Sequence, residues 1–281
     1  RNITAFSVVI KIPFVLYLIE KVKKINKKVL LIILVYLSFL CVTIIQSRAS
    51  FIAVGLIVVG FITLKTIKFF KHTKNKKTLF SAVYILAPLF LAIITNKTLI
   101  ADLGADVISR AATISFSVND GSVDKRLRYY EDVLTHLVSN PIIGTGLGNW
   151  KIKSIYYDSK DIGGYVVPYH AHSDFIQLGA ELGILGFFLY ISVFILAVYY
   201  VFIFIKNSRE NTQEKTFVFL LLLVLGVYFI DANLNFPIAR PQILVVWSVT
   251  MALIVIYYQK HKMIIKPLKT KPILTFFFIS L

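Results

Sequence analysis

Two histidines and an aspartate stand close together at residues 170–174, directly before a long apolar run. The imidazole of His170 or His172 can take a proton from a hydroxyl group at neutral pH, because a histidine titrates close to that pH. The spacing of two residues would also place both imidazoles on one face of an extended segment, where a metal ion could bind with Asp174 as a third ligand. An HxH pair alone is a weak metal signal, so we favour acid–base chemistry. Asp174 either orients one of the histidines or caps the helix that follows.

Three arginines come from separate segments: Arg48, Arg126 and Arg240. A guanidinium group is a planar, permanently charged fork that binds phosphate oxygens in a bidentate manner. Arginines that converge at one membrane surface favour a ligand that combines a diphosphate with a lipid tail. The alternative is that each arginine anchors the chain to lipid headgroups by snorkelling. For Arg48 we favour binding, because it lies in a hairpin of only a few residues in a chain that otherwise anchors with lysine.

Carboxylates and glycines give further candidates. Glu181 and Asp231 lie near or within apolar runs, where a carboxylate is by default a candidate functional group. Asp231 pairs either with Arg240 or with another buried partner. The segment Gly144–Gly148 lacks the preceding strand and the Lys-Ser/Thr pair of a phosphate-binding loop, so a turn is the better interpretation. His136 is expected to lie on the polar surface of a helix.

The chain that carries these groups has the composition of an integral membrane protein. Of its 281 residues 57% are apolar, and the mean hydropathy is +0.77, whereas soluble domains have about 45–50% apolar residues. The net charge of +17 does not point to nucleic acid, because the lysines cluster in short loops between apolar runs. Cys41 is the only cysteine, so an internal disulfide is excluded. The chain starts at Arg1 and ends in the apolar run Pro272–Leu281, which is too short to span about 30 Å, and we expect a fragment of a larger protein.

Seven apolar runs alternate with basic clusters along the chain. The runs cover residues 3–19, 29–46, 51–64, 79–95, 175–205, 217–233 and 243–258. Lysine-rich clusters lie between and after them, at residues 21–28, 65–77, 206–215 and 260–271. The positive-inside rule puts these clusters in the cytoplasm and puts Arg48, Arg240 and a long polar loop on the outer side. The pattern predicts an all-α, polytopic transmembrane helical bundle of about seven spans plus a truncated one.

The long loop divides the chain into three parts. We expect transmembrane helices, an outer loop with the reactive side chains, and transmembrane helices again, over residues 1–95, 96–174 and 175–281. The loop is expected to be partly helical, with one helix over Ala101–Ile114. Apolar residues spaced by three and four predict an amphipathic helix over Asp124–Ser139. Arg126 and Arg128 lie near the start of that helix, which Asn140-Pro141 ends.

Several motifs, in this order, resemble the O-antigen ligase/polymerase family. They are Ser47-Arg48-Ala49 between two spans, Arg126 four residues before Tyr130, the segment Pro141–Gly148, and His172–Gln177 followed by Glu181-Leu182-Gly183. Each motif is short, but their order and common side of the membrane are fairly specific over residues 40–190. The segment Asp231–Pro241 is similar to one branch of the family. Ser173 and Tyr130 stand where the family often has Asn and Trp, and neither difference removes a reactive group.

The resemblance implies a metal-independent glycosyltransferase of the polytopic GT-C type. Such an enzyme transfers a glycan from an undecaprenyl diphosphate carrier to a glycan, lipid A-core or protein acceptor, at the periplasmic face of the bacterial inner membrane. By this resemblance Arg48 and Arg126 hold the donor diphosphate, and His172 activates the acceptor hydroxyl. No metal and no other cofactor is expected. Membrane lipids are expected as further partners, and nucleic acid is not. Supporting roles are given to His170, Asp174, Arg128, Glu181 and Arg240.

Three classes of function stay open. The first is a lipid-linked glycan transferase, whether ligase, polymerase or protein O-glycosyltransferase. The second is a transporter or polysaccharide-export component whose outer loop recognises a solute; broken helices in paired halves and ionisable residues at mid-membrane are typical of transporters. The third is a scaffold whose loop binds partners, which leaves the outward arginines unexplained. The arginines and histidines cluster on one side of the membrane, and this favours the enzyme.

Overall fold

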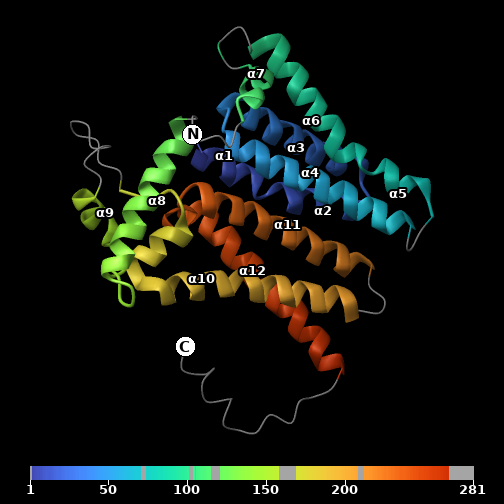
Figure 1. Ribbon diagram of the computed structural model, residues 1–281. Helices are drawn as coiled ribbons and strands as arrows, with labels where there is room; N and C mark the ends of the chain where they lie inside the picture. The colour runs from blue at the N-terminus through green and yellow to red at the C-terminus, as the bar shows by residue number, and fades with distance from the viewer. Residues whose placement is uncertain are drawn as a thin grey trace.

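The computed structural model describes residues 2–70, 74–100, 104, 106–114, 121–157, 169–207 and 212–265. These residues are largely helical, and they contain no strand. Seven spans are long and apolar enough to cross a membrane, in agreement with the seven predicted runs (Figure 1). The all-α polytopic bundle is therefore confirmed for the described part of the chain, and the apolar run Pro272–Leu281 lies outside it.

Each span is one helix or a short series of helices. The first span consists of α1 (Asn2–Val9) and α2 (Ile12–Lys21), and the fourth of α5 (Lys76–Phe80), α6 (Val83–Thr95) and the π-helix η2 (Asn96–Ile100). The others are α3 (Ile25–Ile45), α4 (Arg48–Lys68), α10 (Asp174–Asn207), α11 (Thr212–Leu234) and α12 (Pro241–Ile265). Further elements connect the spans: the long helix α8 (Gly121–Ser139), the short helices α7 (Val107–Ala112) and α9 (Trp150–Lys153), and the 3-10 turns η4 (Ser154–Tyr156) and η5 (Pro237–Ala239).

The first span is broken where polar and proline residues interrupt its apolar run. Ile10 and Lys11 separate α1 from α2, and the side chain of Lys11 is exposed. Pro13 lies in the first turn of α2, where its missing N–H costs no helical hydrogen bond. Ile10 and Leu16 are fully buried, so this short, interrupted run still packs into the bundle as a span.

Helix α11 is the centre of the bundle. It packs against α2, α4, α10 and α12, and buried side chains point in several directions from it, among them Leu221, Val227 and Tyr228. A helix that is apolar all round is typical of such a central position. Because α11 is held by helices on several sides, it fixes the position of the turn that follows it, residues 231–240.

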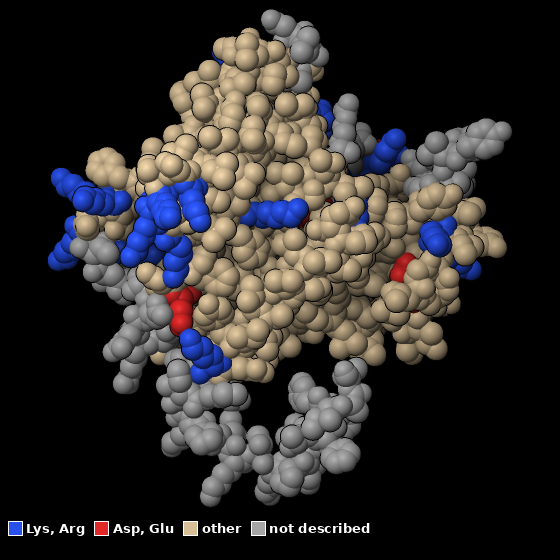
Figure 2. All heavy atoms as spheres, turned by 180° about the vertical axis from the view of Figure 1, so that it is seen from behind, with Lys and Arg blue, Asp and Glu red and all other residues tan. Residues whose placement is uncertain are grey.

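The two ends of the bundle differ in chemistry. At one end Lys21 donates to Gln213, Lys65 pairs with Glu20, and Lys260 pairs with Glu214; we call this the lysine-rich end. Helices α7, α8 and α9 lie toward the opposite end, which we call the loop end (Figure 1). Figure 2 shows the largest group of Lys and Arg at one edge of the molecule, next to a mostly uncharged middle.

The predicted amphipathic helix is confirmed as α8: it ends at Ser139 as expected but begins at Gly121, three residues before the predicted start at Asp124. The helix expected over Ala101–Ile114 is shorter, because α7 covers Val107–Ala112. Residues 101–103 and 105 lie outside the described residues.

A second, small core lies beneath α8 at the loop end. Val133, Trp150 and Ala180 are buried in it. The expectation that His136 lies on the polar surface is wrong, because this residue is 1% exposed. Its Nδ1 lies 3.1 Å from the hydroxyl oxygen of Tyr157, and its ring packs against Trp150. The helical periodicity could not reveal that residues 150–157 fold back over this side of α8.

Candidate functional site

Three separate segments meet at the loop end: α8, the residues around the start of α10, and the turn between α11 and α12. The hydroxyl of Tyr130 on α8 lies 3.2 Å from the carbonyl oxygen of Asn233 and 3.5 Å from that of His172. Nη2 of Arg126 donates to the carbonyl oxygen of Leu234 at 3.2 Å. These contacts join α8 to both other segments, so they hold Arg126 and His172 in one cluster.

His172 has an unusual backbone conformation within this cluster. Its φ of 56° lies in the left-handed region, which residues other than glycine rarely adopt and which is found preferentially at functional sites. The imidazole stacks on Tyr129 with 5.8 Å between ring centroids, and it meets the ring of Phe236 edge-on at 5.4 Å. Its Nδ1 is buried and has no hydrogen-bond partner within the described residues.

The surroundings of His172 keep its imidazole neutral. Burial, followed by the positive charge of Arg126 and by the nearby His170 and Arg240, lowers the pKa of His172 to about 4. Burial and nearby positive charge both disfavour the imidazolium form. The side chain is therefore unprotonated at neutral pH and is able to accept a proton.

His170 is oriented by a chain of hydrogen bonds. Its Nδ1 donates to Oε1 of Gln177 at 3.2 Å, and Nε2 of Gln177 donates to Oε1 of Glu181 at 3.1 Å. Oε2 of Glu181 in turn accepts from the backbone N–H of Gly148 at 2.8 Å. When His170 is neutral, this arrangement leaves the lone pair on its Nε2. Burial lowers the pKa of His170, although the hydrogen bond to Gln177 opposes the shift.

Phe236 connects the two histidines with Arg240. The ring of His170 stacks on Phe236 with 3.9 Å between centroids and 15° between planes. The guanidinium carbon of Arg240 lies 4.0 Å from the centroid of the same ring. Two groups this close cannot share one face, so His170 and Arg240 cover opposite faces of Phe236. Sequence reasoning did not assign a role to Phe236; its only signal was the Asn-Phe-Pro turn between two apolar runs.

Three buried residues with ionisable side chains belong to the same two segments as His172 and Phe236. Arg240, Asp174 and Asp231 are 7%, 1% and 0% exposed. Oδ2 of Asp174 accepts from the backbone N–H of Ile238 at 3.0 Å, and Oδ1 of Asp231 accepts from Nδ2 of Asn235 at 2.7 Å. Of the two partners considered for Asp231, the structure therefore has the buried neighbour, Asn235, and not an ion pair with Arg240. Both carboxylates still oppose the burial that lowers the pKa of Arg240.

The two remaining arginines have contacts elsewhere at the loop end. Arg48 is the first residue of α4, and its Nη1 donates to the carbonyl oxygen of Thr113 just after α7, at 3.0 Å. Arg128 forms an ion pair with Asp124 one turn earlier on α8. The cluster around His172 thus contains Arg126 and Arg240, whereas Arg48 is associated with α7.

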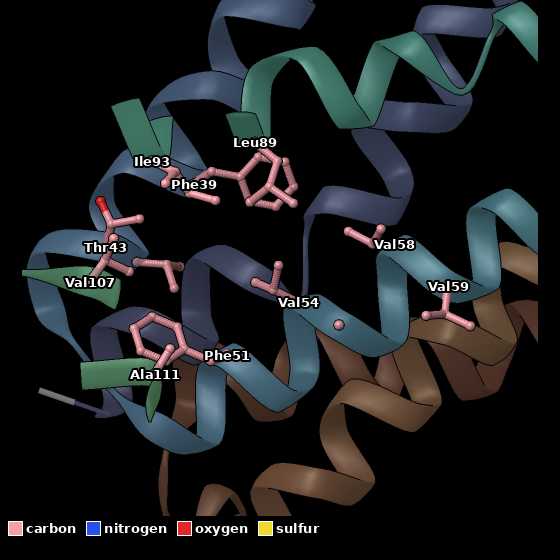
Figure 3. A pocket seen from close by; sticks show the side chains of 12 residues that line it. Phe39, Thr43, Phe51, Val54, Val58, Val59, Leu89, Ile93, Val107 and Ala111 are labelled. Carbon is pink, nitrogen blue, oxygen red and sulfur yellow. The ribbon is translucent and has the colours of Figure 1, made fainter. Parts of the chain in front are cut away.

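An apolar groove of about 310 Å3 lies near Arg48, between α3, α4, α6 and α7. Figure 3 shows the side chains that line it, nearly all of them hydrocarbon. Phe51 of α4, one turn from Arg48, and Ala111 of α7 both line it. The remaining lining residues are Phe39, Val42, Thr43, Val54, Gly55, Val58, Val59, Leu89, Ile93 and Val107. The groove has the shape and chemistry to hold part of a hydrocarbon chain.

The glycine-rich segment Pro141–Gly148 is a turn, as the sequence indicates, and it docks into a break in α10. The break is at Gly183, where φ is 72°. The amide N–H groups of Thr145 and Gly146 donate to the carbonyl oxygens of Ala180 and Glu181, at 3.0 and 2.8 Å. A Cβ at Gly144 would lie 2.5 Å from the carbonyl oxygen of Ala180. The amide N–H groups of Thr145 and Gly146 are therefore bound to α10. In this arrangement they are not available to bind a phosphate.

The other use considered for the two histidines is a metal site, and the described residues provide no set of ligands for it. There, no group of three His, Cys, Asp or Glu side chains is arranged to hold a metal ion. His170 lies parallel to the Phe236 ring and His172 perpendicular to it, so the two imidazoles do not share one orientation.

Comparison with known proteins identifies the chain at the level of a family. A search of curated proteins and a search of solved structures give no match. The model of the family described as O-antigen ligase matches residues 32–191, which is more than half of the chain and includes Arg48, Arg126 and His172. The chain therefore belongs to the O-antigen ligase family.

Proposed function

We propose that the protein is a membrane glycosyltransferase that moves a glycan from a polyprenyl diphosphate carrier, such as undecaprenyl diphosphate, to an acceptor hydroxyl. The family implies glycan and lipid-linked substrates. The observation that carries the proposal is the neutral imidazole of His172 in one cluster with Arg126. By the positive-inside rule the loop end faces outward, toward the periplasm if the membrane is a bacterial inner membrane.

The proposed reaction needs one base and at least one fixed cation. The acceptor oxygen bonds to the anomeric carbon of the donor glycan as the bond between that carbon and the diphosphate oxygen breaks. The bonding electrons leave with the polyprenyl diphosphate, and the acceptor proton passes to the imidazole of His172. Arg126 stabilises the negative charge that builds up on the leaving diphosphate.

Donor binding would prepare His172 for this role. After burial, the charge of Arg126 is the strongest influence that lowers the pKa of His172. A diphosphate beside Arg126 offsets that charge and raises the pKa toward its ordinary value. A general base works best when its pKa lies near the operating pH, so the bound donor would strengthen the base that receives the acceptor proton.

The apolar groove supports a lipid-linked donor. It runs along α4 from Phe51, one turn from the guanidinium-bearing residue Arg48. A polyprenyl chain in the groove would bring its diphosphate to the loop end, where Arg48 offers a bidentate phosphate partner. Arg48 and Arg126 would then contact the donor from α4 and α8, two elements far apart in the sequence.

The direct test replaces His172 in the purified protein. The His172→Ala variant receives an undecaprenyl-diphosphate-linked glycan and a hydroxyl acceptor, and transfer and donor binding are measured separately. We expect transfer to fall by about 10²–10⁴-fold, the usual contribution of a general base, while donor binding is retained. Lys125→Gln is the matched control, because Lys125 is exposed and adjacent to Arg126 on α8, and it should leave transfer unchanged. Normal turnover in the His172→Ala variant would contradict the base role.

A further inference from the structure

A second cavity lies next to the His172 cluster, and the proposed function does not yet use it. It has a volume of about 320 Å3 and lies between the first turns of α10, the end of the glycine-rich segment and the turn η5. Its polar lining consists of Lys151, His170, Asp174, Gln177 and Glu181. Apolar side chains from all three segments complete the walls, among them Leu147, Leu178 and Ile238.

The mixture of groups in this cavity fits a sugar ring. Carboxylate and amide oxygens accept hydrogen bonds from hydroxyl groups, and Leu147, Leu178 and Ile238 offer apolar surface to C–H groups. The amide nitrogen of Gln177 carries two N–H groups and donates one hydrogen bond to Glu181, so a second N–H is available for a sugar oxygen.

The polar wall is already organised before a ligand binds. The chain of hydrogen bonds from His170 through Gln177 and Glu181 to the N–H of Gly148 fixes the orientation of three lining side chains. A prearranged site loses less conformational entropy on binding than a flexible one. The volume lies at the small end of the range of ligand pockets, about 300–1,000 Å3, which suits a ligand of roughly one or two sugar rings.

The cationic groups distinguish this cavity from the proposed diphosphate site. Among the described residues that line it there is no arginine, and the one lysine, Lys151, is accompanied by the carboxylate of Glu181. These residues therefore offer no guanidinium fork to a diphosphate, and the mixed polar and apolar wall suits an uncharged sugar. The cavity is nevertheless adjacent to the proposed base, because His170 lines it and shares the ring of Phe236 with His172.

We propose that this cavity is the subsite for the acceptor, in which Asp174, Gln177 and Glu181 bind the sugar ring next to the hydroxyl that reacts. The assignment rests on the proposed function and adds the class of acceptor: a saccharide, bound through its hydroxyl groups. The donor glycan carries sugar rings as well, so the experiment must separate the two substrates.

The test fills the cavity from its exposed side. Leu147 is 68% exposed and lines the cavity, so Leu147→Trp adds bulk there without disturbing a core; Lys151→Trp, at another exposed lining residue, is the second variant. Ile143→Trp is the matched control, since Ile143 is 80% exposed in the same segment and does not line the cavity. We expect both cavity variants to raise the KM for a saccharide acceptor by at least about tenfold, which corresponds to about 1.4 kcal/mol, with the KM for the donor and the control unchanged.

A binding measurement keeps the result independent of catalysis. Saturation-transfer NMR on the His172→Ala protein, with N-acetylglucosamine, galactose and rhamnose as probes, should detect contact with at least one sugar, and Leu147→Trp should abolish it. If sugar binding responds in this way but no transfer occurs, the subsite stands and the proposed function fails. If transfer occurs and both cavity variants leave the acceptor KM unchanged, or raise the donor KM instead, the acceptor subsite is wrong.

Discussion

At the scale of single residues, the candidate site depends on an aromatic ring with no reactive group of its own. Phe236 touches His170 on one face, Arg240 on the other and His172 at its edge. It reaches them from a turn held by α11, the most enclosed helix of the bundle. The ring therefore sets the distance between the two imidazoles and the buried guanidinium.

We expect Phe236→Leu to impair the reaction by misplacing His172, whereas Phe236→Tyr, which keeps the ring, should restore most activity. A misplacement of this kind costs up to about 100-fold in turnover. Loss of the ring also admits water, which raises the pKa of His172 from about 4. Since the base must be unprotonated, the fall in activity at low pH should move to higher pH.

The control for this prediction is Phe229→Leu. Phe229 packs against Phe175 and Phe194 and is 46% exposed, so it is an aromatic residue of the same helix–turn region outside the cluster. A kcat–pH profile compares the variants. An equal loss in both phenylalanine variants, with no change in the profile of Phe236→Leu, would assign Phe236 to packing alone.

Arg48 gives a second prediction at this scale. Arg48→Lys keeps the positive charge but loses the planar fork that binds two phosphate oxygens at once. We expect the KM for the lipid-linked donor to rise about tenfold, equivalent to about 1.4 kcal/mol, with a smaller effect on the acceptor. Steady-state kinetics with each substrate varied in turn measures this, and unchanged donor kinetics would mean that Arg48 only anchors α4.

At the scale of elements, the site depends on how the segment Pro141–Gly148 locks into α10. The break at Gly183 exposes the carbonyl oxygens of Ala180 and Glu181, and the N–H of Ile184 donates to the carbonyl oxygen of Pro141 at 2.9 Å. The same segment presents Gly148 to Glu181. This contact orients Gln177 and His170, so the docked turn supports the histidine side of the site.

We expect Gly144→Ala to destabilise the protein and lower its activity. Its φ is +66° and the new Cβ would lie 2.5 Å from a carbonyl oxygen of α10. Gly104→Ala is the control, since its φ is +87° and nothing lies within 4 Å of a Cβ there; it carries the backbone strain without the clash. The clash should make Gly144→Ala less stable than Gly104→Ala by about 1–3 kcal/mol, measured as a lower thermal midpoint in detergent. Equal midpoints for the two variants would contradict the close packing of the segment Pro141–Gly148 against α10.

The sequence predicts the helices better than the contacts between segments that are distant in the chain. Apolar runs and the three-and-four spacing of α8 are local properties, and they located the spans and the amphipathic helix. The burial of His136, the break at Gly183 and the ring of Phe236 between His170 and Arg240 depend on segments distant in the chain. The resemblance to the family singled out Arg126 and His172 as site residues. The contacts of Tyr130 explain how these two residues come together, and the roles proposed for them stay a prediction.

At the scale of the whole molecule, the distribution of charge implies an orientation in the membrane. The ion pairs of Lys65 and Lys260 lie at the lysine-rich end, and the cluster around His172 lies at the loop end. Positive charge favours the cytoplasmic side. The proposed chemistry would therefore occur outside the cytoplasm.

This orientation can be measured by labelling single cysteines in intact cells, after Cys41, the only native cysteine, has been replaced by Ser. Lys151→Cys and Lys27→Cys place thiols at exposed positions of the loop end and of the lysine-rich end. We expect a membrane-impermeant maleimide to label the former and to label the latter only after the cells are opened. The reverse pattern would place the site in the cytoplasm.

The break in α10 also bears on the height of the candidate site above the hydrocarbon layer of the membrane. The helix is broken at Gly183, and the part after the break, residues 184–207, is about 36 Å long at 1.5 Å per residue, enough to cross the roughly 30 Å hydrocarbon layer of a bilayer. The part before the break, residues 174–182, adds about 13 Å. If the later part spans the hydrocarbon layer, this first part would extend beyond it and would hold His172 and the adjacent cavity in the layer of headgroups and water. The acceptor hydroxyl and the donor diphosphate would then meet at the level of the headgroups, above the hydrocarbon layer that holds the polyprenyl chain.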